Sequence, residues 1–204
     1  MTYLRAALVT LSTALIPACS SNPAPPAVPP SDVTAYPALR DSGYAETTLV
    51  SDFPMPPTEF RAWVEVGNKF VAAMDGEGSI AKPVDTVYLT GDWPEVGATR
   101  RVELSDGHYV LERVVDNQPS RFEYQIWNIT SGAGSNVDHV HGVQQFDTNA
   151  AGGTRLTWSY RVMPDAGFKR PFVSRFVKNE IRPFLQGSLD TMQAWAAEDV
   201  AGEG

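Results

Sequence analysis

The side chains best suited to chemistry in this sequence are a glutamate and an arginine within predicted β-strands. Glu112 alternates with apolar residues such as Val110, and Arg100 alternates with Val102, so both are expected to point inward with apolar neighbours. A buried carboxylate needs a partner. The Glu112 carboxylate could accept a ligand hydroxyl directly or through water, and a purely structural ion pair with Arg100 is the alternative.

Whether Arg100 and Glu112 meet depends on the turn between their strands, at Asp106-Gly107. A two-residue turn places the two side chains on opposite faces of the hairpin, whereas a three-residue or bulged turn places them on the same face. We favour the bulged turn and hence a contact between the two side chains.

His139 and His141 stand two residues apart on a predicted strand and therefore project from one face, close to Asp138. A His-x-His pair can supply two zinc ligands or an acid and a base. No third ligand follows at a suitable spacing, so we predict no metal and place both histidines at a cavity edge or facing solvent. His108, in a turn, is expected to be exposed. No nucleophile-base set or phosphate loop is recognisable, so no catalytic residue or cofactor is assigned.

Composition and charge narrow the function classes. The 204 residues are 43% hydrophobic and 20% charged, which suits one domain with a sizeable core. The formal net charge is -8, and this acidic balance argues against nucleic acid as a partner because nucleic-acid binders carry a basic patch. The single cysteine excludes a disulfide within the chain.

The first residues indicate an export signal. Arg5 precedes an uncharged apolar run from Ala6 to Ile16, which is too short to span a bilayer. The sequence Ile16-Pro17-Ala18-Cys19 resembles a bacterial lipobox, which implies that residues 1–18 are removed and that Cys19 is lipidated. An ordinary signal peptide cut nearby is the alternative. The expected location is extracytoplasmic, with the protein anchored to the cell membrane or outer membrane through Cys19.

Residues 19–42 are expected to form a tether. Their many prolines, interleaved with alanine and serine, favour extended polyproline segments over a packed core. At about 3.1 Å per residue such a tether reaches roughly 60 Å. A proline motif that binds a partner is the alternative interpretation.

The folded domain is predicted at 43–200, followed by a disordered tail at 201–204. It begins with a strand at Tyr44–Val50, followed by two short helices that meet at Gly67. Short turns then separate six strands, which are therefore antiparallel neighbours. These strands are Val84–Thr90, Ala98–Leu104, His108–Val115, Arg121–Asn128, Val137–Phe146 and Thr154–Met163.

A long amphipathic helix is predicted over Lys169–Glu198. Apolar residues recur at steps of three and four, which places them on one helical face: Phe168, Phe172, Phe176, Val177, Ile181, Phe184, Leu185, Leu189, Met192 and Trp195. Pro183 is expected to bend the helix, and Gly187 to loosen it. Such a one-sided helix needs a broad sheet as its partner.

Two strands show a clear aromatic face opposite a polar face. Phe122, Tyr124 and Ile126 alternate with polar residues on one strand, as do Trp158 and Tyr160 on the other. We expect the aromatic face to meet the long helix, with Phe172 and Phe176 opposite it, and the polar face to meet water. Large rigid rings leave gaps that a ligand can fill, and a solid aromatic core is the alternative.

One stretch of the sequence resembles a known family. The segment Gly91–Arg100, the turn at Asp106-Gly107 and Glu112-Arg113 are similar to the SRPBCC superfamily, which includes START, Bet v 1 and polyketide cyclase/dehydrase proteins. The resemblance covers residues 43–198. It implies an α+β helix-grip fold, in which a curved antiparallel sheet wraps around a long C-terminal helix. It also implies a deep cavity for a hydrophobic or amphipathic small molecule such as a lipid, sterol or polyketide. Because the glutamate at the matching position often lines the ligand site in this family, the resemblance makes Glu112 our first choice as a polar anchor.

Three functions follow as hypotheses. The first is a lipid-anchored protein that holds or carries a hydrophobic ligand. The second is a cyclase or dehydratase in which Glu112 or a histidine moves a proton on a polyketide-like substrate. The third is an interaction module with a vestigial pocket. The absence of a recognisable catalytic set favours the first.

Overall fold

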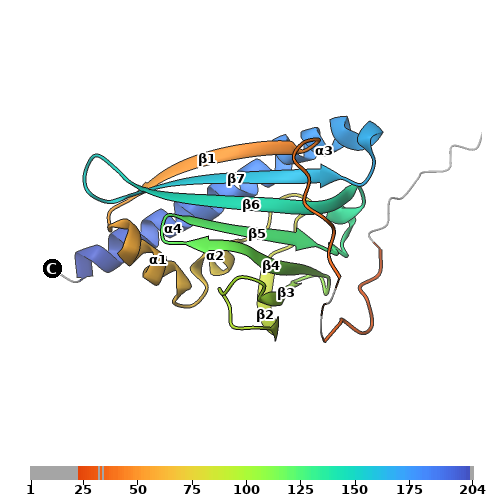
Figure 1. Ribbon diagram of the computed structural model, residues 1–204, viewed down its shortest axis with the longest axis horizontal. Coiled ribbons are helices and arrows are strands. Elements are labelled where there is room, and N and C mark those ends of the chain that lie inside the picture. Colours follow the sequence, from red (N-terminus) through yellow and green to blue (C-terminus); the bar gives the residue numbers. More distant parts are fainter. Residues whose placement is uncertain (1–22, 32, 34, 203–204) are drawn as a thin grey trace, which may run out of the picture.

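The computed structural model describes residues 23–31, 33 and 35–202 of the chain, and it places seven strands in one antiparallel sheet with the order β1-β7-β6-β5-β4-β3-β2. The sheet curves, and the long C-terminal helix crosses one of its faces (Figure 1). This arrangement confirms the predicted helix-grip fold. The strands are β1 Ala45–Phe53, β2 Pro83–Thr90, β3 Thr99–Leu104, β4 Tyr109–Gln118, β5 Arg121–Trp127, β6 Val137–Thr148 and β7 Thr154–Pro164.

Two short helices, α1 (Pro57–Glu65) and α2 (Lys69–Ala72), separate β1 from β2. They meet where predicted, because Gly67 and Asn68 adopt positive φ angles of 69° and 50° and turn the chain between them. Helix α1 starts at a proline, whose missing N–H needs no partner in a first turn. Both helices lie on the same side of the sheet as the C-terminal helix (Figure 1).

The C-terminal helix is a continuous run of α3 (Arg170–Phe176), a π-helical turn (Val177–Ile181) and α4 (Arg182–Gly202). The π-helical turn ends two residues before Pro183. Proline cannot donate the usual hydrogen bond to the residue four positions earlier, and a wider turn at this point changes the local pairing. The helix runs to Gly202, so the disordered tail predicted for 201–204 is wrong for its first two residues.

The apolar face of this helix begins later than predicted. Phe168 and Phe172 are 78% and 68% exposed, and neither contributes to the core. The buried residues at the start of the helix are instead Val173 and Val177. The spacing was compatible with both faces, and the helix packs on the sheet through these valines, which leaves the two phenylalanines on its outer side.

The second face of the sheet is partly covered, which corrects the prediction that it meets water for that part only, since Val50 on the same face is 56% exposed and the Arg155 and Asp52 side chains are about half exposed. The residues 23–31, 33 and 35–42, called here the N-terminal strap, run across this outer face without regular secondary structure (Figure 1). The Arg101 guanidinium donates to the carbonyl oxygen of Pro30 at 2.6 Å, and the Gln125 amide donates to that of Pro37 at 2.8 Å. These residues are therefore part of the fold and not a free tether.

Aromatic packing holds the same strap in place. Tyr36 meets Trp127 edge to face, with 5.9 Å between ring centroids, and the Arg113 guanidinium lies 3.7 Å from the centre of the Tyr36 ring. Val33 packs on a small cluster that Trp127 forms with Leu111. Such contacts stabilise a segment that has no core of its own.

The strap also buries a histidine that we expected to be exposed. The His108 ring is 2% exposed. Its Nε2 atom lies 3.0 Å from the Pro23 carbonyl oxygen, and its Nδ1 atom lies 3.1 Å from Thr130 Oγ1. The turn position alone suggested exposure, because nothing in the local sequence indicated that the strap would reach it.

No helix in the described part of the chain is both long enough and apolar enough to cross a membrane. Cys19 and residues 1–18 lie outside the described residues, so the lipidation site and the signal peptide stay predictions.

Candidate functional site

A cavity of about 240 Å³ lies between the inner face of the sheet and the helices. This finding favours the cavity over a solid aromatic core. Its volume is just below the roughly 300 Å³ at the lower end of small-molecule sites. Most lining side chains are apolar, and they come from the sheet, from α1 and α2, and from the C-terminal helix. They include the predicted Phe122, Tyr124, Trp158, Tyr160 and Phe176, together with Phe70, Met74, Ile126 and Phe184.

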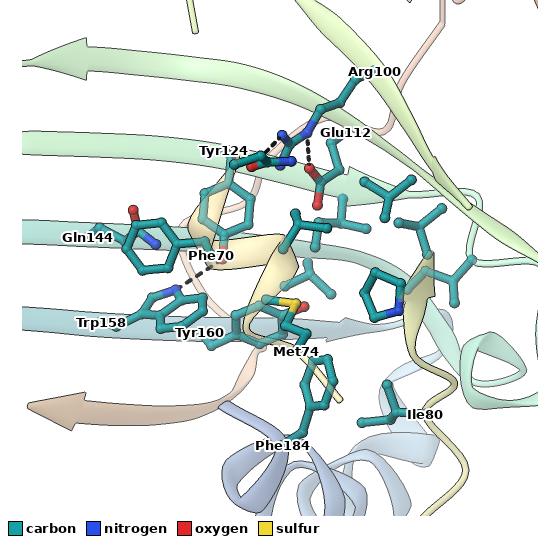
Figure 2. A pocket seen from close by; sticks show the side chains of 18 of the residues that line it. Phe70, Met74, Ile80, Arg100, Glu112, Tyr124, Gln144, Trp158, Tyr160 and Phe184 are labelled. Atoms are coloured by element: carbon teal, nitrogen blue, oxygen red, sulfur yellow. Dashed lines mark hydrogen bonds and ion pairs between the residues drawn. The ribbon is translucent and has the colours of Figure 1, made fainter. Parts of the chain in front are cut away.

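Arg100 and Glu112 form a buried ion pair at one wall of this cavity (Figure 2). Arg100 Nε donates to Glu112 Oε2 at 2.6 Å, and both side chains are less than one tenth exposed. The residues are direct cross-strand neighbours, because the hairpin has the three-residue loop 105–107 with Gly107 at φ 82°. Glycine tolerates that conformation, and this geometry confirms the contact that we favoured.

Two further residues hold the arginine. Arg100 Nη1 donates to Asn68 Oδ1 at 3.1 Å, which ties the sheet to the chain between α1 and α2. The Arg100 guanidinium also lies 3.8 Å from the centre of the Trp93 ring. These contacts fix the orientation of the Arg100 guanidinium. Because Glu112 is bonded to it, the Glu112 carboxylate also has a fixed orientation at the cavity wall.

Three polar groups at the cavity have no protein partner among the described residues. They are Oε1 of Glu112, the side-chain amide of Gln144 and the hydroxyl of Tyr160, and all three side chains are more than nine tenths buried. No side-chain nitrogen or oxygen atom in the described residues is both inaccessible and unpaired. These groups therefore border the open space, where a ligand or water can pair with them.

Tyr124 lies next to these groups. Its hydroxyl accepts a hydrogen bond from Trp158 Nε1 at 3.0 Å. Burial raises the pKa of Tyr124 well above its ordinary value, and the negative charge of Glu112 adds to this shift. Burial, followed by the charge of Glu112, also raises the pKa of Tyr160. Both phenols thus stay protonated and serve as hydrogen-bond donors.

The predicted histidines belong to the other face of the sheet. His139 and His141 alternate with Val140 and Gln144, which line the cavity, so they point to the outer face. His139 is fully buried, and His141 is 8% exposed. Their placement at the cavity edge or in solvent is therefore wrong.

Each histidine has its own structural partners on that outer face. His139 Nδ1 lies 2.9 Å from Asp138 Oδ2, and its Nε2 lies 2.9 Å from the Tyr44 hydroxyl. His141 Nε2 lies 2.8 Å from Glu123 Oε2. Among the described residues, no group of three side chains is arranged to hold a metal ion.

Sequence reasoning missed Gln144, although a signal for it was present. Strand β6 carries Gly142 at a position where a Cβ atom would stand 2.2 Å from the Tyr124 ring. A glycine inside a strand often marks the close approach of another group, and here it makes room for a cavity-lining tyrosine. Gln144 follows two residues later and so shares the inner face.

One loop beside the cavity is fastened to the long helix. Ile80 and Ala81 line the cavity from the loop after α2. The backbone N–H and the hydroxyl of Ser79 both donate to Glu180 Oε2, at 2.8 Å and 2.5 Å. Glu180 lies in the π-helical turn, so this turn positions a carboxylate that holds the loop over the apolar part of the cavity.

A curved sheet, a long helix and a cavity between them with a few inward polar groups define a helix-grip protein with a small-molecule site. The chain belongs to the family described as polyketide cyclase / dehydrase and lipid transport, whose profile matches residues 48–196. This places it in the SRPBCC superfamily, as the sequence predicted. A comparison with curated proteins found no match.

Several solved structures share the fold at low sequence identity. Ara h 8.0201 matches with a TM-score of 0.54 and 14% identity over 76% of this chain and 99% of its own. A major latex-like protein from Panax ginseng matches with a TM-score of 0.53 and 12% identity over 76% and 99%. The di-domain ARO/CYC protein StfQ of the steffimycin biosynthetic pathway matches with a TM-score of 0.57 and 12% identity, over 78% of this chain and 52% of StfQ.

Proposed function

We propose that this protein binds a hydrophobic or amphipathic small molecule in the cavity, as a binding or carrier protein at the surface of the cell envelope. The observation that carries the proposal is the pairing of an apolar cavity with three buried polar groups that lack a protein partner. Glu112 can accept a hydrogen bond from the ligand, Tyr160 can donate one, and Gln144 can do either. The volume of about 240 Å³ favours a small or slender ligand with one polar end.

The first experiment asks whether the cavity is occupied and accessible. Native mass spectrometry should detect a hydrophobic molecule that co-purifies and that organic extraction removes. The extracted protein should bind the neutral dye N-phenyl-1-naphthylamine with saturable fluorescence at one site. The absence of both an added mass and saturable dye binding would contradict the proposal.

A substitution that fills the cavity, compared with the same substitution on the outer face, tests whether the dye binds in the cavity. Val110 lines the cavity and Val143 lies on the outer face. Val110→Phe should weaken dye binding roughly tenfold or more because the added ring occupies the site, whereas Val143→Phe should leave it unchanged. Both proteins should remain folded by circular dichroism, and equal dye affinity in both variants would place the dye elsewhere.

A cyclase or dehydrase function is a second candidate, because Glu112 stands beside two phenols whose pKa values are raised. Protonated phenols stabilise a developing oxyanion, and a carboxylate can remove a proton. The family description and the likeness in fold to an ARO/CYC protein support this candidate. A Glu112→Gln variant of an enzyme would still bind a polyketide analogue but would lose turnover, whereas a binding protein would show no turnover in either form.

The proposed location rests on the sequence of the first residues. We infer a lipidated Cys19 from the lipobox-like sequence that precedes it. The contacts of the strap shorten the distance between such an anchor and the folded domain. Only four residue steps separate Cys19 from Pro23, which already contacts His108, so an anchor at Cys19 would hold the domain within roughly 15 Å of the membrane.

A single substitution tests the anchor. Cys19→Ser should shift the protein from the detergent-extracted membrane fraction to the soluble or secreted fraction, and the acyl mass at the N-terminus should disappear. Unchanged fractionation, with no acyl mass on the wild-type protein, would exclude lipidation. This result would leave the ligand-binding proposal intact.

A further inference from the structure

The beginning of the C-terminal helix differs in charge from the rest of the protein. The eleven residues from Phe168 to Lys178 contain four of the 16 lysines and arginines of the chain and none of its 24 acidic residues. We call the exposed surface of this segment the basic-aromatic face. In a chain with a net charge of -8, such a local excess of positive charge points to an anionic partner.

Two exposed phenylalanines accompany these charges. Phe168 and Phe172 are 78% and 68% exposed, and one helical turn separates them, so they project from the same side. Val173 and Val177 point the opposite way and are buried. Because the buried valines already fix the helix on the sheet, the phenylalanines are not needed for its packing.

The cations of the segment are largely available to a partner. Arg175 and Lys178 are exposed and form no ion pair with any residue that the structure describes. Lys169 reaches Asp165 at 2.7 Å in an exposed pair, which contributes little to stability. Arg170 donates to the Tyr44 carbonyl oxygen, so its charge is not neutralised.

The position of the segment favours a broad partner. Helix α3 lies at the end of the molecule opposite the C-terminus, and the described beginning of the strap lies at that same end (Figure 1). Exposed aromatic side chains that project from a helix and are ringed by lysine and arginine are typical of a contact with a lipid surface. A pocket for one peptide or one small anion is not built here, because the phenylalanines protrude.

We propose that the basic-aromatic face docks on an anionic membrane, with Phe168 and Phe172 at the level of the headgroups and acyl boundary. The cations then lie among the lipid phosphates. This contact is independent of the lipid anchor and of the cavity ligand. It would place one end of the cavity towards the membrane, since the cavity-lining Val137 pairs with Pro164, four residues before Phe168.

The test uses the full chain with Cys19→Ser, so that no acyl chain contributes. Sedimentation with vesicles of phosphatidylcholine alone, or of phosphatidylcholine with phosphatidylglycerol, measures the partition coefficient. Binding should be at least about tenfold stronger with the anionic lipid and should weaken with added salt. Equal partition into both kinds of vesicle would overturn the proposal.

Substitutions in the same background locate the contact. Combining Phe168→Ser with Phe172→Ser should lower the partition coefficient at least about tenfold, and combining Arg175→Gln with Lys178→Gln should remove most of the preference for anionic lipid. The matched control is Val50→Ser, an exposed apolar side chain on β1, which should leave binding unchanged. Dye binding in the cavity should be the same in all of these proteins, so a failure here is distinct from a failure of the ligand-binding proposal.

Two outcomes contradict the membrane contact. If the double phenylalanine variant binds vesicles like its parent, another part of the chain, such as residues 1–18, carries the binding. If the parent is a dimer by analytical ultracentrifugation and the same variant is a monomer, Phe168 and Phe172 form an interface between copies of the chain instead.

Discussion

The two faces of the sheet bury the same kinds of polar residue in opposite circumstances. On the outer face, the Gln125 amide donates to the strap, and the Tyr44 hydroxyl lies 2.9 Å from His139 Nε2. On the inner face, Gln144 and Tyr160 are buried to a similar degree, yet neither has a partner among the described residues. Paired polar groups stabilise a fold, whereas unpaired ones beside an open space are suited to a ligand. This contrast is why we propose the inner face as the ligand site.

The segments that lie on the two faces of the sheet also differ in how closely they pack. The outer cover is a chain segment without helix or strand that follows the sheet closely and contacts it through carbonyl oxygens and one tyrosine. The inner cover consists of rigid helices. A rigid helix cannot follow every hollow of a curved sheet, and a void therefore remains beneath it.

The largest effect that we expect concerns the ion pair at the cavity wall. Arg100→Met should lower the free energy of unfolding by about 3–5 kcal/mol, because it leaves the Glu112 carboxylate buried without its cation. Urea denaturation monitored by tryptophan fluorescence measures this loss. The side chains of Arg100 and Glu112 are only 7% and 9% exposed, so the few waters that the cavity admits cannot compensate for a full cation.

An exposed pair is the control for that measurement. Arg155 and Asp52 form a similar pair at 2.9 Å on the edge of the sheet, but their side chains are about half exposed. Arg155→Met should change the stability little, because solvent screens exposed charges. If both substitutions were equally mild, the Arg100–Glu112 pair would not be a buried charge pair in solution.

The next effect contrasts two tyrosine hydroxyls. His139 Nδ1 faces the Asp138 carboxylate, which can only accept a hydrogen bond, so Nε2 is the acceptor and the Tyr44 hydroxyl is its donor. Tyr44→Phe should therefore lower the free energy of unfolding by about 1–3 kcal/mol, since it leaves a buried ring nitrogen unpaired. Tyr160→Phe should leave the stability nearly unchanged, because its hydroxyl has no protein partner among the described residues.

Ligand binding should respond in the reverse order. Tyr160→Phe should weaken the binding of the co-purifying ligand, and Tyr44→Phe should not. Thermal unfolding of the two variants measures the effects on stability, and a binding titration of the same proteins measures the effects on ligand affinity. The contrast between the faces would fail if Tyr160→Phe were as destabilising as Tyr44→Phe with no change in binding.

Local patterns predicted much of the inner face. Alternation placed Phe122, Tyr124 and Trp158 on one side of the sheet, and the residues of the β3–β4 turn were sufficient to favour the contact between Arg100 and Glu112. These predictions succeeded because strand periodicity and turn length are properties of neighbouring residues.

The outer face could not be predicted in this way. The composition of residues 19–42 indicated a chain without helix or strand, and the described part of this segment has neither. Whether such a chain lies free or against a sheet depends on contacts distant in sequence. Tyr36 meets Trp127 across 91 positions of the chain, and no periodic pattern records such a contact. The position of His108 was predicted wrongly for the same reason, because the ring contacts Pro23 of the strap. His139 and His141 are likewise held by residues distant in sequence, Tyr44 and Glu123.

The smallest expected effect is a pH dependence of stability that arises on the outer face. Burial lowers the pKa of His141 below its ordinary value of 6.5, and the neighbouring carboxylate of Glu123 opposes this shift without reversing it. Arg161 and Arg121, the other charged groups close to the ring, favour the neutral form as well. His141 is therefore neutral in the folded protein at a pH where the unfolded chain has begun to bind a proton.

The sign of the effect follows from this difference. The stability that the neutral ring contributes is complete above about pH 6.5 and is lost as the pH falls through the pKa of the folded state. The wild-type protein should therefore lose more stability than His141→Gln between roughly pH 7 and pH 5, as measured by urea denaturation at each pH. If the attraction of Glu123 outweighed burial, the difference between the two proteins would change in the opposite direction. That result would mean that water reaches the His141 ring more freely than its 8% exposed fraction indicates, and that the polar groups of the outer face are less enclosed than those at the cavity.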